Sequence, residues 1–356
     1  MKQLLDTVAA LKRVGATGES AVLATLMKVA GSAYSGPGAT LLILPDATVA
    51  GNLGASCFEQ DLVGHARRVR TSGAAELVRY DLTADDDKPW GLGMGCRGKL
   101  DLLLEAAPPG RVPEHLAFLV EAARVRQAAA VATLFRAGAA AAPAMGERAM
   151  VRADGHAAGR LLSGPLGAKV REDARGVLAE ARTRLCTHRL PSGRGGGTAE
   201  LLVEFVPPPI KLLVCDGGRD AESLERLAQE LAWQVSVIGK GRLPSGLDDR
   251  SAAVIMSHNY ERDLSLLMAL VPSPARYIGV LGSRDRTRGL LAELGKRGEK
   301  PTKAQLARIH GPVGLDLGGE TPPEVALSIV AEIQAVFAGR RGGALRARKG
   351  PIHDRP

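Results

Sequence analysis

The sequence predicts an α/β protein in which an N-terminal α+β domain is followed by a Rossmann-like domain with a doubly wound parallel sheet. The chain has 356 residues, which is long for a single hydrophobic core. Its first half contains short strands joined by turns, a pattern typical of antiparallel sheets. After Pro207, apolar strands alternate with amphipathic helices, which is typical of a parallel sheet covered on both faces.

Hydrophobic periodicity and turn residues predict the elements of the first domain, residues 1–206. A helix over 1–14 has Leu4, Leu5, Val8 and Leu11 at helical spacing and ends at Gly15. No internal repeat is expected. The other expected elements are strands over 20–29, 39–44, 48–50, 76–80, 100–105, 129–135, 148–152 and 201–206, and helices over 57–69, 114–128 and 171–183.

The run Pro207–Pro209 predicts the domain boundary, because a proline linker carries no sheet hydrogen bonds. The Rossmann-like domain is expected to span 207–338. Residues 339–356, rich in glycine and arginine, are expected to be a disordered basic tail. The second domain is expected to contain strands over 211–215, 234–238, 252–256 and 276–280, and helices over 221–231, 261–270, 287–294 and 322–337.

Composition narrows the classes of function. The net charge is +9, but the tail from residue 340 contributes about +5 of it, so the body is not basic enough to indicate DNA binding. Aromatic residues make up 3%, which disfavours base-stacking platforms for nucleic acid. The four cysteines form no CxxC pair, and there is no secretory signal or long apolar run. We therefore expect a cytoplasmic protein with free thiols, without nucleic-acid or membrane partners.

The segment 51–59, Gly-Asn-Leu-Gly-Ala-Ser-Cys-Phe-Glu, is the strongest candidate site. Ser56 and Glu59 have the spacing of a capping box, which makes Ser56 the N-cap and Cys57 the first helical residue. The positive end of the helix dipole favours the thiolate, and Gly54 permits close approach of a ligand to the backbone. The alternative is a structural helix cap that contains a small apolar residue.

A second cysteine lies in another glycine-rich loop. Cys96 is preceded by three glycines within six residues and followed by Arg97, whose charge favours an accessible thiolate. Two such cysteines do not make a closed zinc site, but they suit a transferable sulfur-bound metal or a persulfide. Cys186 and Cys215 are expected to be buried apolar residues.

The second domain begins with an altered nucleotide-binding fingerprint. Gly218 and Ala221 occupy the second and third positions of GxGxxG/A, but Asp216 replaces the first glycine. A carboxylate there would face a pyrophosphate. The acid expected after the second strand, which would bind a ribose, is replaced by residues 239–241, Gly-Lys-Gly. NAD(P) binding is therefore not expected, although the fold is.

Two later loops follow predicted strands, at the sheet edge where open α/β folds bind ligands. His258 follows the strand ending at Met256, and Asp263 is placed to orient it; alternatively His258 caps the helix and Asp263 is a surface acid. Ser283 and Arg284 follow the next strand and suit an anion, or form an ordinary βα turn. Thr321 with Glu324 predicts a capping box that is structural.

Taken in order, these motifs resemble the XdhC/CoxI family, the accessory proteins of molybdenum hydroxylases such as xanthine and carbon monoxide dehydrogenases. The resemblance covers roughly residues 10–338. The matching segments are Gly31-Ser32, Pro37-Gly38, Gly54–Glu59, Gly93–Gly98, Ser257-His258, Tyr277–Ser283, Pro312–Asp316 and Thr321–Glu324.

The resemblance implies a cytoplasmic, dimeric chaperone, a maturation factor rather than an enzyme that turns over substrate. It would bind molybdenum cofactor (molybdopterin), protect it while a cysteine desulfurase adds the terminal sulfido ligand, and insert it into the apoenzyme. Cys57 and Cys96 match the family's motif cysteines and are the expected molybdenum ligands. The remaining expected cofactor-binding residues are Gly54, Ser56, Arg97, His258, Ser283 and Arg284.

The sequence departs from the family pattern at two places. The family motif usually reads Gly-Gly-Cys, whereas Ala55-Ser56 precedes Cys57 here. A phenylalanine-led glycine turn is replaced by residues 215–218, Cys-Asp-Gly-Gly, which argues against a nucleotide role. Two alternative functions stay open: an NAD(P)-dependent oxidoreductase with His258 and Asp263 as acid and base, and a silent scaffold that docks the partner enzyme.

Overall fold

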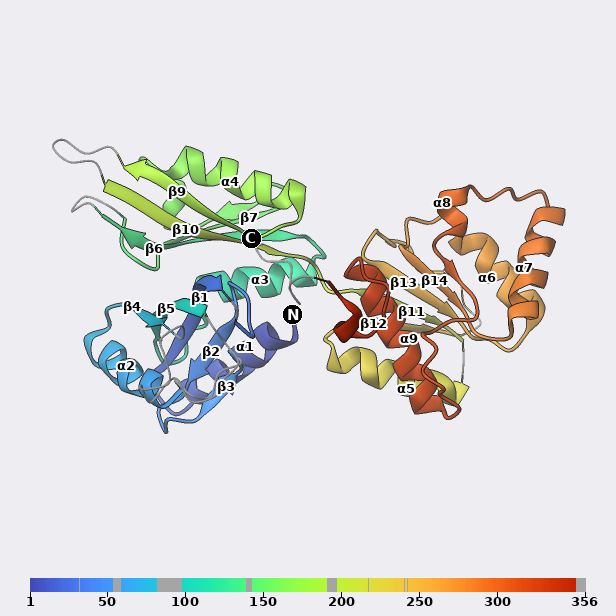
Figure 1. The fold of residues 1–356 in the computed structure, drawn as a ribbon, viewed down its shortest axis with the longest axis horizontal. Helices are drawn as coiled ribbons and strands as arrows, with labels where there is room; N and C mark the ends of the chain where they lie inside the picture. Colours follow the sequence, from blue (N-terminus) through green and yellow to red (C-terminus); the bar gives the residue numbers. More distant parts are fainter. Residues whose placement is uncertain are drawn as a thin grey trace. The chain divides into compact units, whose positions relative to one another are not determined.

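The computed structural model describes residues 1–31, 33–53, 59–81, 98–138, 143–190, 197–216, 218–239, 241 and 243–349 (Figure 1). The chain forms two compact units. The N-terminal unit spans Gln3–Pro208 and the C-terminal unit begins at Pro209, so the division lies within the proline run 207–209. Within the described residues, no helix is long and apolar enough to cross a membrane.

The first part of the N-terminal unit is an antiparallel sheet covered by a helix. Leu62, Ala66 and Val69 lie on one face of α2 and pack into the core of this sheet, where all three are buried. The strand order is β3-β2-β1-β5-β4. The elements are α1 (Lys2–Gly15), β1 (Ala21–Gly31), β2 (Thr40–Ile43), β3 (Val49–Gly51), α2 (Glu59–Ser72), β4 (Glu76–Asp81) and β5 (Gly98–Ala107).

The second part of this unit repeats the same connectivity. Its strand order, β8-β7-β6-β10-β9, is that of the first sheet with each strand replaced by its counterpart. The elements are α3 (Glu114–Arg124), β6 (Ala129–Ala137), β7 (Arg148–Arg152), β8 (Ala157–Ala158), the 3-10 turn η2 (Arg160–Leu162), α4 (Gly167–Glu180), β9 (Arg184–Leu190) and β10 (Gly197–Val206). The expectation of no internal repeat is therefore wrong.

The two copies align residue by residue, without a gap, from 21–72 onto 129–180. Gly51 and Gly159 correspond and have left-handed backbones, with φ of 101° and 108°. Each packs against the first residue of the neighbouring strand, Thr40 or Arg148, so closely that a Cβ would meet its carbonyl oxygen. Three buried positions of α2 also correspond to three of α4: Leu62, Ala66 and Val69 to Val170, Ala174 and Val177.

The two sheets face each other through corresponding residues. Met27 and Leu103 from the first sheet form a buried cluster with their counterparts Phe135 and Leu202 from the second. Corresponding residues of the two copies are therefore buried against each other, as they are in the interface of a symmetric dimer.

Charged residues beside this cluster repeat the arrangement. Lys28 and Arg136 correspond, as do Asp101 and Glu200. Arg136 contacts both acids, at 3.0 Å from Asp101 and 2.7 Å from Glu200, and Lys28 lies 3.3 Å from Glu200.

The C-terminal unit is a Rossmann-like domain with a parallel sheet, as the sequence predicts. The sheet has the order β12-β11-β13-β14-β15, and its last strand was not predicted. Helices α5 and α9 contribute to the core on one face, and α6 and α7 to the core on the other. The elements are β11 (Lys211–Cys215), α5 (Gly218–Glu230), β12 (Gln234–Ile238), β13 (Ser251–Ile255), α6 (Tyr260–Leu270), β14 (Tyr277–Val280), α7 (Arg284–Lys296), α8 (Lys303–Leu306), β15 (Ile309–His310) and α9 (Pro322–Phe337).

The segment after α9, which the sequence predicts to be a disordered tail, is described as far as Lys349. Gly342 lies against Leu315, so closely that a Cβ on the glycine would meet the leucine side chain at 2.8 Å. A 3-10 turn, η3 (Leu345–Ala347), follows. Gly342 therefore lies against the body of the C-terminal unit, whereas the side chains of residues 341–347 are exposed.

Candidate functional site

The turn after β11 keeps the shape of a nucleotide-binding turn without its chemistry. Asp216, at the place of the first glycine, has a left-handed backbone with φ of 67°, and Gly218 also has a positive φ. The Asp216 N–H donates to the carbonyl of Ile238 in β12 at 2.7 Å. A carboxylate thus stands where the fingerprint normally leaves room for phosphate.

His258 lies just beyond β13, at the carboxyl edge of the parallel sheet. Its backbone is left-handed, with φ of 56°, and its side chain is 67% exposed. Its Nε2 lies 3.5 Å from a carboxylate oxygen of Asp220 in the first turn of α5. Asn259, rather than His258, caps α6, because its side chain accepts from the Arg262 N–H.

Asp263 does not orient His258, contrary to the sequence prediction. It is 1% exposed and accepts hydrogen bonds from Ser257 and from the guanidinium of Arg286, the latter at 2.6 Å. The carboxylate is therefore used to join the start of α6 to α7. Neither alternative from the sequence holds, since Asp263 is not a surface acid either.

The loop after β14 likewise has a structural role, because it caps the next helix. Ser283 is the N-cap of α7, and its hydroxyl accepts from the Arg286 N–H at 3.2 Å. Arg284 is the first residue of α7 and is exposed. Sequence reasoning chose Arg284 for its position in the motif, but Arg286 is the arginine that turns inward.

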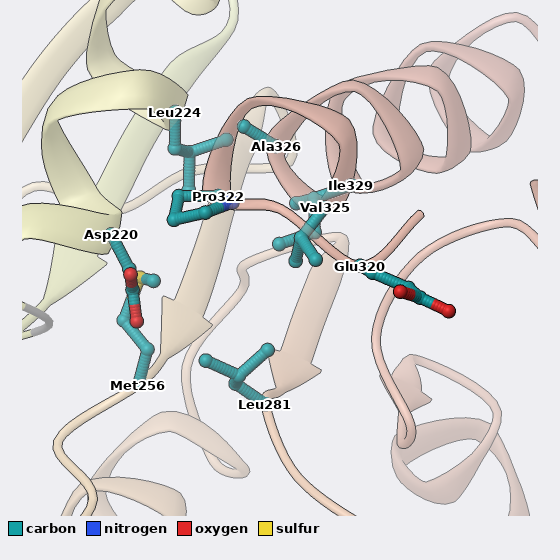
Figure 2. A pocket seen from close by; sticks show the side chains of 9 residues that line it. All are labelled: Asp220, Leu224, Met256, Leu281, Glu320, Pro322, Val325, Ala326 and Ile329. Atoms are coloured by element: carbon teal, nitrogen blue, oxygen red, sulfur yellow. The ribbon is translucent and has the colours of Figure 1, made fainter. Parts of the chain in front are cut away.

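A pocket of about 220 Å³ lies at this same edge, between the strand ends and the helices α5 and α9 (Figure 2). Its apolar lining consists of Leu224, Met256, Leu281, Pro322, Val325, Ala326 and Ile329, and its two polar lining residues are Asp220 and Glu320. Sequence reasoning missed the pocket. The one feature of the sequence that could have indicated the pocket is Asp220, an acid in the first turn of the helix after the fingerprint.

Cys57 and Cys96 lie outside the described residues, as do Gly54, Ser56 and Arg97. The described ends of both connections can still be located. Strands β3 and β4 run in the same direction as β1, because all three alternate with the antiparallel β2 and β5. The connections that contain Cys57 and Cys96 therefore both leave the first sheet at the same end of its strands, after Gly51 and after Asp81, but from the two opposite edge strands β3 and β4.

The two described cysteines differ in burial: Cys215 is buried, as the sequence predicts, whereas Cys186 is only half-buried, contrary to the prediction. Cys215 is fully buried, and burial raises the pKa of its thiol to about 12. Burial, with Asp173 nearby, raises the pKa of Cys186 to about 11. Both thiols are neutral at physiological pH and are unsuited to metal binding or nucleophilic attack.

Comparisons with known proteins agree with this architecture. Residues 212–333 match the XdhC Rossmann domain, and residues 15–81 and 122–190 match the XdhC and CoxI family. The latter two stretches end at the ends of β4 and β9, which are corresponding strands of the two copies. Together these matches cover more than half of the chain.

Related proteins resemble the chain over most of its length. A Bacillus subtilis protein, described as a probable subunit of xanthine dehydrogenase, is 26% identical over 340 residues, covering 88% of this chain and 92% of that protein. The "molybdenum cofactor insertion chaperone PaoD" from Escherichia coli is 23% identical, covering 90% of this chain and 84% of its own.

A crystal structure described as a xanthine dehydrogenase from Bacillus halodurans has the same fold, with a TM-score of 0.71 and 24% identity. The alignment covers 94% of this chain and 96% of that one. The sequence matches, the duplicated N-terminal unit and the Rossmann-like unit lead to one conclusion: the chain belongs to the XdhC/CoxI family.

Proposed function

We propose that this chain is an accessory chaperone that binds molybdenum cofactor and inserts it into a molybdenum hydroxylase of the xanthine or carbon monoxide dehydrogenase type. Family membership and the functions named for two relatives support an accessory role. The proposal includes protection of the cofactor during sulfuration by a cysteine desulfurase, and a homodimeric, cytoplasmic chain.

The observation that carries the proposal is the common origin of the two cysteine-containing connections. Both leave the same end of the first sheet, from its two opposite edge strands, so Cys57 and Cys96 are attached to the same rigid frame although 39 positions separate them in the sequence. Thiolates are suitable ligands for a soft metal–sulfur centre. The donor set therefore fits the cofactor, with Cys57 and Cys96 as molybdenum ligands.

The second copy has no cysteine at the position of Cys57, which limits the site to the first copy. Where Cys57 stands in the first copy, the ungapped alignment places Pro165 in the second. We therefore expect one molybdenum per chain. When bound, the cofactor would supply the metal centre that the partner enzyme needs. The thiolates of this chain would hold the cofactor, and the surface of the chain would dock on the partner enzyme for delivery.

We propose a different role for each of the remaining residues of the site. Gly54 and Ser56 would leave backbone N–H groups open to the cofactor, and Arg97 would favour ionisation of Cys96. For the Rossmann-like unit we propose only the edge around His258, since Ser283 already caps α7 and Arg284 makes no described inward contact.

The test is cofactor retention. The full chain would be produced with cofactor supplied, and molybdenum and pterin would be measured in the wild type, Cys57→Ala, Cys96→Ala and Cys186→Ala. Loss of bound molybdenum is expected in the first two variants and full retention in the third, whose thiol is neutral. Full retention in both Cys57→Ala and Cys96→Ala would show that the proposed ligands are wrong.

A further inference from the structure

We propose that the pocket at the carboxyl edge of the Rossmann-like sheet binds a planar heterocycle with adjacent N–H donors, the edge that a 2-amino-4-oxopterin presents, with the Asp220 carboxylate as acceptor. The inference rests on the proposed function, because a pterin is the organic part of molybdenum cofactor. It assigns to this unit a ligand of its own.

The walls of the pocket suit a flat apolar ring. Met256 and Leu281 follow the ends of β13 and β14, while Leu224 and Val325 come from α5 and α9. Figure 2 shows these side chains approaching from different sides of one space. A ring between them would exchange water for aliphatic carbon on both faces.

The size of the pocket favours a single ring system over a dinucleotide. Its volume is about 220 Å³. Sites for drug-sized ligands usually enclose roughly 300–1,000 Å³. A bicyclic heterocycle fits the smaller space, whereas NAD, with two nucleosides and a pyrophosphate, does not.

The described lining offers phosphate no positive charge and favours hydrogen-bond donors as ligands. Of the nine described residues that line the pocket, none is lysine or arginine, and the two ionisable ones are Asp220 and Glu320. A carboxylate only accepts hydrogen bonds when ionised, and its two oxygens match two parallel N–H donors. The ring nitrogen and exocyclic amino group of a pterin provide such a pair.

Asp220 is the better placed of the two acids. It belongs to the first turn of α5 and lines the pocket, and its carboxylate lies 3.5 Å from Nε2 of His258. In Figure 2 the Asp220 side chain lies beside Met256, whereas Glu320 is at the opposite side and points away from the apolar residues. We therefore assign recognition to Asp220 and none to Glu320.

Two matched ligand pairs test the chemistry on the full-length chain by calorimetry or by quenching of pterin fluorescence. Lumazine carries an oxo group where pterin carries the 2-amino group, and inosine carries only a hydrogen where guanosine carries its 2-amino group. Pterin and guanosine are expected to bind at least about tenfold more tightly than lumazine and inosine, because the analogues leave a carboxylate oxygen without a donor. Equal binding of guanosine, inosine and adenosine would mean that the Asp220 carboxylate binds the ribose hydroxyls rather than the base. That result would overturn the proposal.

Variants locate the acceptor. Asp220→Asn retains the shape but replaces one acceptor with a donor, so pterin binding should weaken about tenfold and the preference over lumazine should disappear. Glu222→Gln, on an exposed position of the same helix, and Glu320→Gln are the controls and should bind pterin as the wild type does. Unchanged pterin preference in Asp220→Asn, with unfolding temperatures confirming intact folds, would refute the assignment.

The result is independent of the cysteine test. Heterocycle titration requires no molybdenum and is expected to be the same in Cys57→Ala. If pterin and lumazine bind alike while the cysteine variants lose molybdenum, the pocket assignment alone fails.

Discussion

Glu105 on β5 and Glu204 on β10 occupy corresponding positions in the two copies, but only Glu105 forms an ion pair with an arginine. Glu105 pairs with Leu23 in the sheet register, and Glu204 with the corresponding residue of β6. Arg148 donates two hydrogen bonds to Glu105, one of them at 2.8 Å. In the first copy the residue that corresponds to Arg148 is Thr40, so no described cation forms an ion pair with Glu204.

Because Glu105 has an arginine partner and Glu204 has none among the described residues, replacing each by glutamine should have opposite effects on stability. Burial raises the pKa of Glu204 to about 7 from an ordinary value of 4.5, although Arg148 acts in the other direction. Because the folded-state pKa is raised, stability decreases as pH rises from about 4.5 to about 7. Glu204→Gln removes this loss and should stabilise the N-terminal unit at pH 8 by on the order of 1–2 kcal/mol.

Glu105→Gln is the matched control for this experiment. It leaves the Arg148 guanidinium, only 11% exposed, without its charged partner, so the free energy of unfolding should decrease by about 2–4 kcal/mol. Urea unfolding at pH 5 and pH 8 measures both. If both variants shift stability in the same direction at pH 8, the inferred difference between the copies is wrong.

Phe135 and Met27 are predicted to be coupled in stability. They are corresponding residues in one buried cluster between the sheets. Phe135→Ala should cost about 3–5 kcal/mol and Met27→Ala about 2–5 kcal/mol, each by leaving a cavity. The double variant should cost less than the sum, because the second truncation enlarges an existing cavity. Strict additivity in denaturant titrations would argue against a shared interface.

Glu332 is expected to stabilise the C-terminal unit at neutral pH. Although burial opposes its ionisation, hydrogen bonds from His310 and Tyr277, with the Gly314 N–H at 2.8 Å, hold the pKa of Glu332 below its usual value. A lowered pKa means that this stabilisation is present above about pH 4.5 and is lost as the pH falls through the folded-state pKa.

Glu332→Gln should therefore lower stability at pH 7 by about 2 kcal/mol and make the unfolding free energy less sensitive to pH below 4.5. Thermal unfolding between pH 3 and pH 7 follows both effects. Glu324→Gln, at an exposed helix cap, is the comparison and should cost less than about 1 kcal/mol. An acid dependence identical to that of the wild type would contradict the role of Glu332.

Arg286 and Arg284 should respond differently to truncation. Arg286→Ala removes the guanidinium that pairs with the buried Asp263, and should destabilise the C-terminal unit by about 3 kcal/mol. Arg284→Ala removes an exposed side chain and should change stability by less than about 0.5 kcal/mol. Equal unfolding midpoints for the two variants would be the contrary result.

Local patterns in the sequence were sufficient for most of the elements. The capping box of Thr321 and Glu324 and the helix after it are present as predicted, because both residues lie within one turn of the chain. The strand β11 has the predicted bounds, since a buried parallel strand is a continuous apolar run. The edge strand β12 also has the predicted bounds, although it contains two polar residues and is only half-buried. The duplication escaped detection because the copies share the pattern of burial far more than the identities of residues.

The sequence by itself determined the family and the α/β class with its two parts, and it supplied the two cysteines on which the proposed function rests. These depend on residue types and spacings over a few positions. Only the tertiary structure decided that the N-terminal unit is duplicated, that Asp220 rather than Asp263 meets His258, and that an apolar pocket adjoins that pair. Such contacts join residues far apart in the chain, and their partners are chosen by the packing of whole elements rather than by local pattern.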